Sequence, residues 1–466
     1  MRRRLVVSPS EPRWSTSMNL DSTHVIDELA AFASEYPQGT LSDQARKICA
    51  LLVADLLSAT AAGFDSKLAV AARTTAEKIY GTGKSGLWLS DKKLSIAGAA
   101  MANSAVASAL DLDDGHRGAA GHPGAGIIAA VFSVAQDICA TDDCIFDAIA
   151  IGYDIGLRVA TARPPSTVDT YASGRWVSYG VAAAVGRLLK LNALEMAHAM
   201  GIAGAEGPIG FVNSIYEGST VKEFIPPAVI AGLTGAYRAQ AGATGILDLL
   251  DDERLFSRQV ILGQLGEHWW MEDCYLKPYA CCRYMHAAID AISVLRRPGL
   301  PILSLRIETF PDGLKLPNER TPRTLEGSQY SYYFNAALAA LRGVAALQPV
   351  DPASLEDSEV LALAGIIELV AHDDFVDSFP KGTPCRVILD QGNGPESLTV
   401  LSPLGDVENP MSWEQVIEKF HRLSARVISS DEQSKIVLAV EQIATNGFSP
   451  LFKAINVRLR DETFNS

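Results

Sequence analysis

Three short segments of the chain gather ionisable side chains next to apolar stretches with helical spacing. The first runs from Asp111 to Gly124, contains Asp113-Asp114, and ends in His122-Pro123-Gly124 at the start of an apolar helical pattern. A rigid scaffold usually presents its functional groups on such loops, where a carboxylate can orient a partner and an imidazole can transfer a proton. A solvated connection between two helices is the structural alternative.

The second segment places a cation just before a helix. Lys222, in Thr220-Val221-Lys222, precedes an apolar helical pattern from Pro226 to Ala239. A positive charge at a helix N-terminus opposes the helix dipole, so it is unfavourable unless an anion compensates it. Lys222 is therefore a candidate for contact with an anionic substrate, and an exposed lysine with a structural role is the alternative.

The third segment concentrates Lys277, Arg283 and His286 in a chain whose formal net charge is −14. It lies at a predicted domain boundary, where ligand clefts are common. A guanidinium can bind a carboxylate through two hydrogen bonds, and a lysine crowded by other cations can act as a base. We expect Lys277 to act in catalysis and Arg283 and His286 to bind substrate. Two exposed cations and a helical histidine are the structural alternative.

Together these residue types suit chemistry at a carbon beside a carboxylate. Removing a proton there places a second negative charge on the group, so an enzyme must supply cations or hydrogen-bond donors. Lys222, Lys277 and Arg283 would supply them, His122 titrates in the useful pH range, and Asp111 could orient or polarise a partner. The sequence therefore predicts an enzyme that acts on a small polycarboxylate.

Two further motifs resemble ligand sites but lack required residues. The segment 81–86 has the glycine spacing of a dinucleotide fingerprint, but a helical pattern precedes it, and Lys78 stands where a phosphate loop needs glycine. The segment from Asp111 resembles a calcium loop, but Gly115 and His122 stand where oxygen ligands are required. A transition-metal site that uses the aspartate and histidine residues of this segment, His116 and His122 included, is the remaining alternative. We predict a glycine-rich loop at 81–86 and neither metal nor nucleotide as cofactor.

The composition restricts the class of protein. With 466 residues, of which 48% are hydrophobic and 20% charged, the chain is long enough for two globular domains. Its net charge of −14 disfavours a nucleic-acid partner, and no apolar run reaches the roughly 20 residues that span a bilayer. The seven cysteines have no ligand spacing, so reduced thiols and a cytoplasmic location are expected. Residues 1–18 are predicted to form a loose extension or to precede a start at Met18.

The spacing of apolar residues predicts a mostly α protein. The first half is rich in alanine and has helical spacing at 42–62, 66–79, 94–110, 122–139, 143–162, 178–189 and 193–203. After residue 272 the pattern indicates strands at 304–310, 385–390 and 397–401, the last two joined by a turn, and helices at 331–346 and 356–370. Helical spacing returns at 413–425 and 430–445. We predict a large all-α domain at 19–272, on which 411–466 packs, and a smaller α+β domain at 273–410.

The three segments also resemble a known family. Leu110-Asp111-Leu112-Asp113-Asp114 with His122-Pro123-Gly124, then Thr220-Val221-Lys222, then Lys277-Pro278-Tyr279 through His286 are similar in order and separation to motifs of the MmgE/PrpD family. That family includes 2-methylcitrate dehydratases and cis-aconitate decarboxylases. The resemblance covers nearly the whole chain. It implies a cleft between two domains, a homodimer, no metal, and active-site roles for Asp111, His122, Lys222 and Lys277.

Two positions depart from the family pattern. Tyr171-Ala172 stands where its dehydratases and decarboxylases have His-Pro, and Phe334 aligns with an active-site tyrosine, although Tyr333 is adjacent. The loop between Asp111 and His122 is also one residue longer. These changes spare the cations and alter the proton donors. Epimerisation needs only removal of a proton and its return from the opposite face. The family also includes an epimerase of iminodisuccinate, which this sequence resembles, so the resemblance predicts an epimerase of such an amino-dicarboxylate, in which Tyr171 is an acid–base group.

Two alternatives remain open. A dehydratase of a 2-methylcitrate-like hydroxy-tricarboxylate, or a cis-aconitate-type decarboxylase, would use the same cations with an additional acid. A dimer that binds polycarboxylates without turning them over is the alternative from another class of protein.

Overall fold

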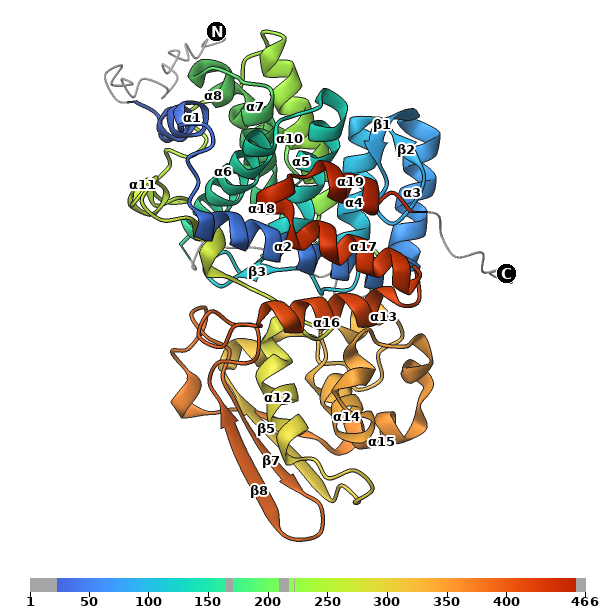
Figure 1. Ribbon diagram of the computed structural model, residues 1–466. Coiled ribbons are helices and arrows are strands. Elements are labelled where there is room, and N and C mark those ends of the chain that lie inside the picture. The colour runs from blue at the N-terminus through green and yellow to red at the C-terminus, as the bar shows by residue number, and fades with distance from the viewer. Residues whose placement is uncertain (1–22, 165–170, 209–217, 222, 458–466) are drawn as a thin grey trace, which may run out of the picture.

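The computed structural model describes residues 23–164, 171–208, 218–221 and 223–457. The predicted extension at 1–18 and the candidate Lys222 lie outside the described residues. Figure 1 shows a body of packed helices joined to a smaller part that contains a sheet. The prediction of a mostly α chain with small sheets is confirmed.

The helical body is built from alanine-rich helices that begin at serine and asparagine caps. Ser42, Ser66 and Ser95 each accept a hydrogen bond from a backbone N–H in the first turn of the helix that follows. Where α6 and α7 cross, a Cβ atom on Gly180 would lie 2.5 Å from the carbonyl oxygen of Gly152, so only glycine permits this approach. The helices are α1 (Val25–Glu35), α2 (Asp43–Gly63), α3 (Lys67–Ile79), α4 (Ile96–Ser108), α5 (Gly124–Ile138), α6 (Asp142–Thr161), α7 (Gly174–Leu188), α8 (Ala193–Glu206), α10 (Ile225–Gln240) and α11 (Arg258–Leu262).

The C-terminal helices return to this body after the chain has passed through the smaller part. They are α16 (Trp413–Ser424), α17 (Ser430–Glu441), α18 (Ile443–Asn446) and α19 (Ser449–Ala454), drawn in red across α2 in Figure 1. Phe420, Ile436 and Phe448 are buried in the same hydrophobic core as α2 and α5. The domain boundaries at 272/273 and 410/411 remain predictions, and the two hydrophobic cores separate close to them.

The smaller part is a four-stranded sheet with helices packed on it. The strand order is β6-β5-β7-β8; β5 pairs with β6 in parallel, whereas the other two pairs are antiparallel. The strands are β5 (Ser304–Thr309), β6 (Glu368–Ala371), β7 (Cys385–Asp390) and β8 (Pro395–Val400). The main helices are α12 (His286–Leu295), α14 (Tyr332–Arg342) and α15 (Ser358–Ile366), with the short α13 (Leu325–Ser328) before α14.

Two sequence predictions of local structure are wrong. The helix predicted at 356–370 ends at Ile366, and 368–371 forms β6, because pairing with β5 supplies backbone partners that outweigh helical spacing. The glycine-rich segment predicted as a loop contains β1 (Thr82–Gly86), which pairs with β2 (Lys93–Leu94). The motif is therefore part of an antiparallel ribbon beside α5, without the strand-to-helix turn that a nucleotide fingerprint requires.

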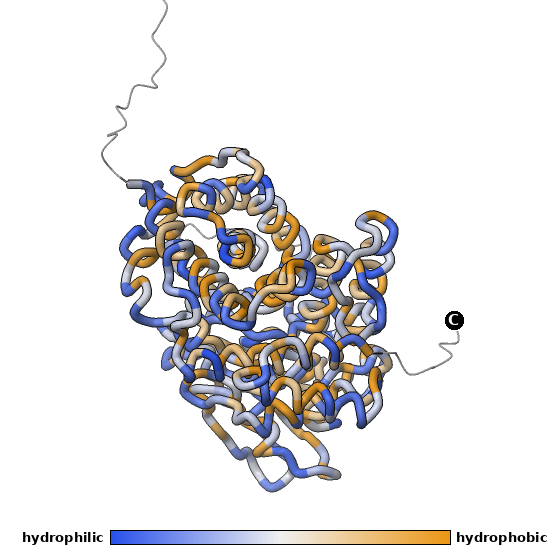
Figure 2. The backbone as a smooth tube through the Cα atoms, turned by 45° about the horizontal axis from the view of Figure 1, so that its top comes forward, coloured by the Kyte–Doolittle hydropathy of each residue, from blue (hydrophilic) through white to orange (hydrophobic). Residues whose placement is uncertain are grey.

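Hydropathy follows the packing. In Figure 2 the orange of apolar residues recurs along the packed helices, and many hydrophilic residues lie in outer turns. Within the described ranges, no single helix is both long and apolar enough to cross a bilayer. The helices α2 and α3, which meet at 96°, reach the length and apolar composition of a membrane span only when they are taken together.

Candidate active site

A two-residue ladder joins the first and third candidate segments. β3 (Gly115–His116) lies in the loop after α4, and β4 (Cys274–Tyr275) lies just before Lys277. Gly115 pairs with Tyr275, and His116 pairs with Cys274. A Cβ atom on Gly115 would lie 2.4 Å from the Tyr275 hydroxyl, so this pairing requires glycine. The ladder brings together segments more than 150 residues apart in the sequence.

Asp111 links the two segments at the centre of the site. Its backbone is left-handed, with φ of 57°, a conformation that aspartate tolerates better than most residues, and it turns the chain directly after α4. One carboxylate oxygen, Oδ2, lies 2.7 Å from Lys277 Nζ, and the other, Oδ1, lies 3.3 Å from His122 Nε2. The structure therefore brings together three of the predicted catalytic residues.

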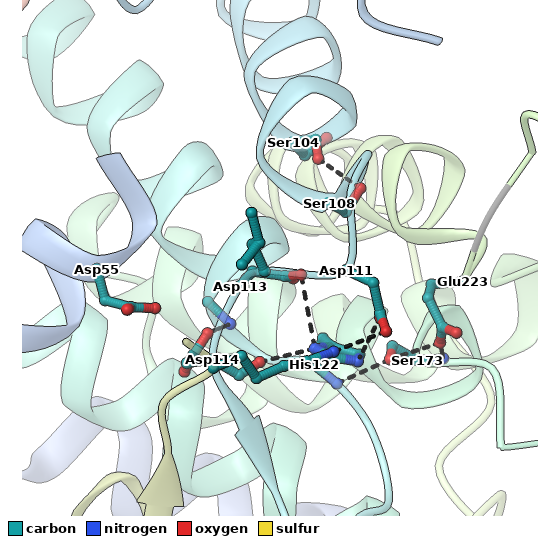
Figure 3. Close-up of polar contacts among 12 residues, drawn as sticks. Asp55, Ser104, Ser108, Asp111, Asp113, Asp114, His122, Ser173 and Glu223 are labelled. Atoms are coloured by element: carbon teal, nitrogen blue, oxygen red, sulfur yellow. Dashed lines mark hydrogen bonds and ion pairs between the residues drawn. The ribbon is translucent and has the colours of Figure 1, made fainter. Parts of the chain in front are cut away.

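His122 has a defined arrangement of its two ring nitrogens. Nδ1 lies 2.8 Å from the carbonyl oxygen of Asp114, and because a carbonyl only accepts, Nδ1 carries the proton. Nε2, next to Asp111, is therefore the nitrogen that can gain and lose a proton. Figure 3 shows the ring held among Asp111, Asp113 and Asp114.

The carboxylates around His122 favour its charged form. Burial opposes the charge and Lys277 repels it, but the carboxylates of Asp113 and Asp111 outweigh both and raise the pKa of His122 above its ordinary value. Asp113 Oδ1 lies 3.6 Å from Nδ1. The imidazolium form, which can act as an acid, thus extends to higher pH than in a free histidine.

Asp114 has a structural role next to the His122 ring. Its oxygens accept hydrogen bonds from Gly124 N at 3.1 Å and from the Tyr153 hydroxyl at 3.0 Å. Burial, followed by the nearby Asp113 and Asp55, raises the pKa of Asp114 to about 8. This carboxyl group is therefore largely protonated at neutral pH and anchors the start of α5 without adding a full charge.

A second chain of hydrogen bonds reaches His122 from the segment beside Lys222. His122 N donates to Ser173 Oγ at 2.9 Å, and Ser173 N and Oγ both donate to Glu223 Oε2, at 2.9 and 3.0 Å. Glu223 and Phe224 are both left-handed, each with φ of 53°, immediately before α10. This strained turn holds the Glu223 carboxylate at the site, as Figure 3 shows.

The pocket lies where the helical body meets the smaller part. Some of the predicted site residues line it, and others lie behind its wall. Asp111, His122, Tyr171 and Arg283 line it. Lys277 is fully buried and lies behind Asp111; its Nζ makes no well-directed hydrogen bond to any residue that the structure describes. The ammonium group therefore acts on the pocket through the Asp111 carboxylate.

Arg283 lines the pocket, but protein groups already occupy its donors, and His286 lies against it. The Arg283 guanidinium donates to Asp406 and to the carbonyl oxygens of Leu276, Pro403 and Leu404, and Nη1 lies 3.0 Å from His286 Nδ1. His286 is fully buried, and burial, with Arg283 and Lys277, lowers its pKa well below the ordinary value. This geometry favours a supporting role for both residues.

Phe334, which the resemblance aligns with an active-site tyrosine, does not line the pocket. It is fully buried in the core of the smaller part, whereas Tyr330, which precedes it by four residues in the sequence, lines the pocket. Tyr171 also lines the pocket, and its ring meets Phe379 edge to face at 6.1 Å between centroids. Burial raises the pKa of Tyr171, so it carries its hydroxyl proton at neutral pH.

One cluster could hold a metal ion. Asp111, Asp113 and His122 each offer a ligand atom, and these atoms lie within 4.8 Å of one another. A cation there would lie close to the Lys277 ammonium, which already neutralises Asp111. Repulsion between like charges disfavours a metal at this place, and the absence of a metal requirement remains a prediction.

The sequence did not single out several residues that shape the site. Arg117, Ser173, Glu223, Tyr275 and Tyr330 all contact the pocket or its supports. Ser173 and Tyr330 carried a signal, since they lie close to the departing positions Tyr171-Ala172 and Phe334. The others have ordinary residue types for loops and reach the site through tertiary packing.

The comparisons with known proteins agree with these motifs. The MmgE/PrpD N-terminal domain matches residues 27–267, and the MmgE/PrpD C-terminal domain matches residues 279–445. A cis-aconitate decarboxylase from Aspergillus terreus is 25% identical over 407 residues, which are 78% of this chain and 82% of that protein. A cis-aconitate decarboxylase-like protein, oryM, from Aspergillus oryzae is 24% identical over 388 residues, 75% of this chain and 80% of its own length. The chain belongs to the MmgE/PrpD family.

Proposed function

We propose that this chain is a lyase that decarboxylates an unsaturated tricarboxylate such as cis-aconitate. The observation that carries the proposal is the cluster of Asp111, His122 and Lys277, in which a buried histidine with a raised pKa lines the pocket. The names of the relatives support this reaction over epimerisation, which was the main prediction from the sequence.

The reaction needs an acid at one carbon. In cis-aconitate the bond between the CH2 carbon and its carboxylate breaks, and its electron pair forms a new double bond to the central carbon. The former π pair takes a proton at the other alkene carbon, which keeps its carboxylate. Carbon dioxide leaves, and no oxidant or reductant is consumed.

His122 donates this proton from Nε2. Its Nδ1–H remains bonded to the Asp114 carbonyl oxygen, so the ring keeps its orientation in both protonation states. Asp111 holds Nε2 in place, and Lys277 neutralises Asp111, so that this carboxylate can lie beside an anionic substrate. Groups that are already held in position for the transition state raise the rate of the reaction, whereas tighter binding of the substrate alone does not.

The position of Phe334 weakens one argument for epimerisation, whereas the position of Tyr171 supports another. Phe334 is a core residue, and Tyr330 supplies a phenol at the pocket. Phenylalanine at position 334 therefore does not mean that the pocket has lost a proton donor. Tyr171 does line the pocket, and a second acid–base group there favours epimerisation of an amino-dicarboxylate as the second candidate.

One experiment separates these functions. The purified protein is incubated in deuterated water with cis-aconitate, 2-methylcitrate and iminodisuccinate, and products are followed by proton NMR. We expect loss of carbon dioxide from cis-aconitate, with one deuterium at the protonated carbon. His122→Asn, which retains a donor for the Asp114 carbonyl but lacks Nε2, should lose at least about a hundredfold in rate.

Other products would replace the proposal. Loss of water from 2-methylcitrate would identify a dehydratase, and inversion of iminodisuccinate without loss of mass would identify an epimerase. Tight binding of polycarboxylates without any product would identify the non-catalytic binding protein. A cytoplasmic homodimer remains part of the proposal, and sedimentation of the purified protein tests the dimer.

A further inference from the structure

Among the described residues, Arg117 is a pocket-lining cation with a hydrogen-bond donor to spare. It lies in the turn after β3, lines the pocket, and its side chain is 17% exposed. Nη1 donates to Thr383 Oγ1 at 3.0 Å, and Nη2 donates to both oxygens of Asp406 at 2.6 Å. Among the described residues, no acceptor is found for its Nε–H. Arg283, by contrast, is saturated by Asp406 and three backbone carbonyls.

The surroundings leave net positive charge beside this free donor. Arg117 and Arg283 share the single carboxylate of Asp406, so the three groups together carry one positive charge. Both guanidinium carbons lie over the Tyr275 ring, at 5.2 and 5.0 Å from its centroid. Aromatic stacking fixes the plane of a guanidinium and therefore the directions of its N–H groups.

Two parts of the molecule set the position of Arg117. Its backbone belongs to the helical body, whereas Thr383 precedes β7 and Asp406 follows β8 in the smaller part. All of these supports are buried. The Arg117 guanidinium is thus preorganised where the two parts of the molecule meet, which reduces the entropy lost when an anion binds.

We infer that Arg117 binds a carboxylate of the substrate that does not react, and that it thereby selects tricarboxylates over dicarboxylates. The inference rests on the proposed function, since it concerns the same pocket. A tricarboxylate can present one carboxylate to Arg117 while another lies beside the carbon protonated by His122. A dicarboxylate that lacks this third group leaves the guanidinium donor without a partner, which costs affinity.

The test measures binding, so that it does not depend on turnover. Dissociation constants are determined by calorimetry for tricarballylate, a saturated tricarboxylate, and for glutarate and 2-methylsuccinate, which each lack one of its carboxylates. For Arg117→Gln we expect about tenfold or more weaker binding of tricarballylate. At least one dicarboxylate lacks the group held by Arg117, and its dissociation constant should change less than about threefold.

Two further variants keep the test interpretable. Arg254→Gln makes the same substitution at an exposed arginine whose one ion-pair partner in the described part of the chain is Asp252, and it should change no dissociation constant. Thr383→Val removes one hydrogen bond that holds Arg117 and keeps all charges, so it should weaken tricarballylate binding by about threefold even if Arg117→Gln fails to fold.

The outcomes distinguish this inference from the proposed function. Unchanged tricarballylate binding in Arg117→Gln, or an equal loss for all three acids, would overturn the inference. A wild-type protein that shows the expected pattern but decarboxylates nothing would support the inference and overturn the proposed function. A wild-type protein that binds none of the acids would overturn both.

Discussion

Two buried lysine–aspartate pairs lie on either side of the turn that follows α4. Lys277 lies 2.7 Å from Asp111, and Lys419, on α16, lies 2.6 Å from Asp55, on α2. Both lysines are fully buried. Lys419 also donates to the carbonyl oxygen of Leu112 at 3.0 Å, so both pairs contact the same short turn.

The two pairs differ in what they can reach. Asp111 lines the pocket and contacts a histidine that can exchange a proton, whereas Asp55 and Lys419 are sealed within the junction of α2 and α16. Asp55 Oδ2 has no hydrogen-bond partner in the described part of the chain. The comparison teaches that a buried ion pair is a candidate for chemistry only when it meets a pocket and a group that titrates.

The largest expected effect is on turnover at the first pair. Lys277→Met leaves Asp111 unneutralised beside an anionic substrate, so we expect kcat to fall by about a hundredfold to ten-thousandfold. Steady-state rates on the substrate identified above, with circular dichroism to verify folding, measure this effect. Retention of near-full activity by a folded Lys277→Met protein would remove this cluster from the mechanism.

The second pair should instead determine stability. Lys419→Met leaves Asp55 buried and without its cation, which typically costs about 3–5 kcal/mol in the free energy of unfolding. The double variant Lys419→Met/Asp55→Leu removes both charges and should recover most of this loss. Denaturant melts measure both variants. If Lys419→Met lost turnover as severely as Lys277→Met without loss of stability, the distinction between the pairs would be wrong.

A smaller effect is expected on the pH profile. If His122 acts as an acid, activity is present below its pKa in the folded protein and falls as the pH rises through that value. Asp113→Asn removes a carboxylate that raises the pKa of His122, so the alkaline limb should move to lower pH. Asp252→Asn, at a partly exposed aspartate that pairs with Arg254, serves as the control. An unmoved limb would show that another group donates the proton.

The smallest expected effect is on metal dependence. The Lys277 ammonium neutralises Asp111 in the cluster that could bind a metal, so exhaustive chelation should leave the rate unchanged. Rates before and after dialysis against a chelator measure this. Activity that is lost on chelation and returns with one divalent ion would contradict the prediction.

Periodic patterns predicted the fold better than they predicted the site. The helical spacing at 42–62 and 143–162 matches α2 and α6 within a residue, because long amphipathic segments carry repeated information. The four residues of β6 follow a helix and resemble its continuation, so only pairing with β5 distinguishes them. The β3–β4 ladder has two residues in each strand and leaves no pattern at all.

The site was predicted where residue types were unusual. Asp111, His122 and Lys277 stood out because they lie in compact motifs, and the structure brings them together. Arg117 and Glu223 resemble ordinary loop residues until tertiary packing places them at the pocket. Phe334 lies in the core of the smaller part and Tyr330 lines the pocket, a difference that their neighbouring positions in the sequence do not reveal.

The bond between Lys419 and Asp55 joins residues 364 positions apart, and this separation has a consequence for synthesis of the chain. Asp55 and the turn at Leu112 leave the ribosome long before α16 does. Until α16 arrives, Asp55 lacks its cation and the turn lacks a donor for its carbonyl oxygen. A nascent chain that contains every pocket residue up to Asp406 therefore still lacks one support of its catalytic turn, so the site is completed only after α16 has been synthesised.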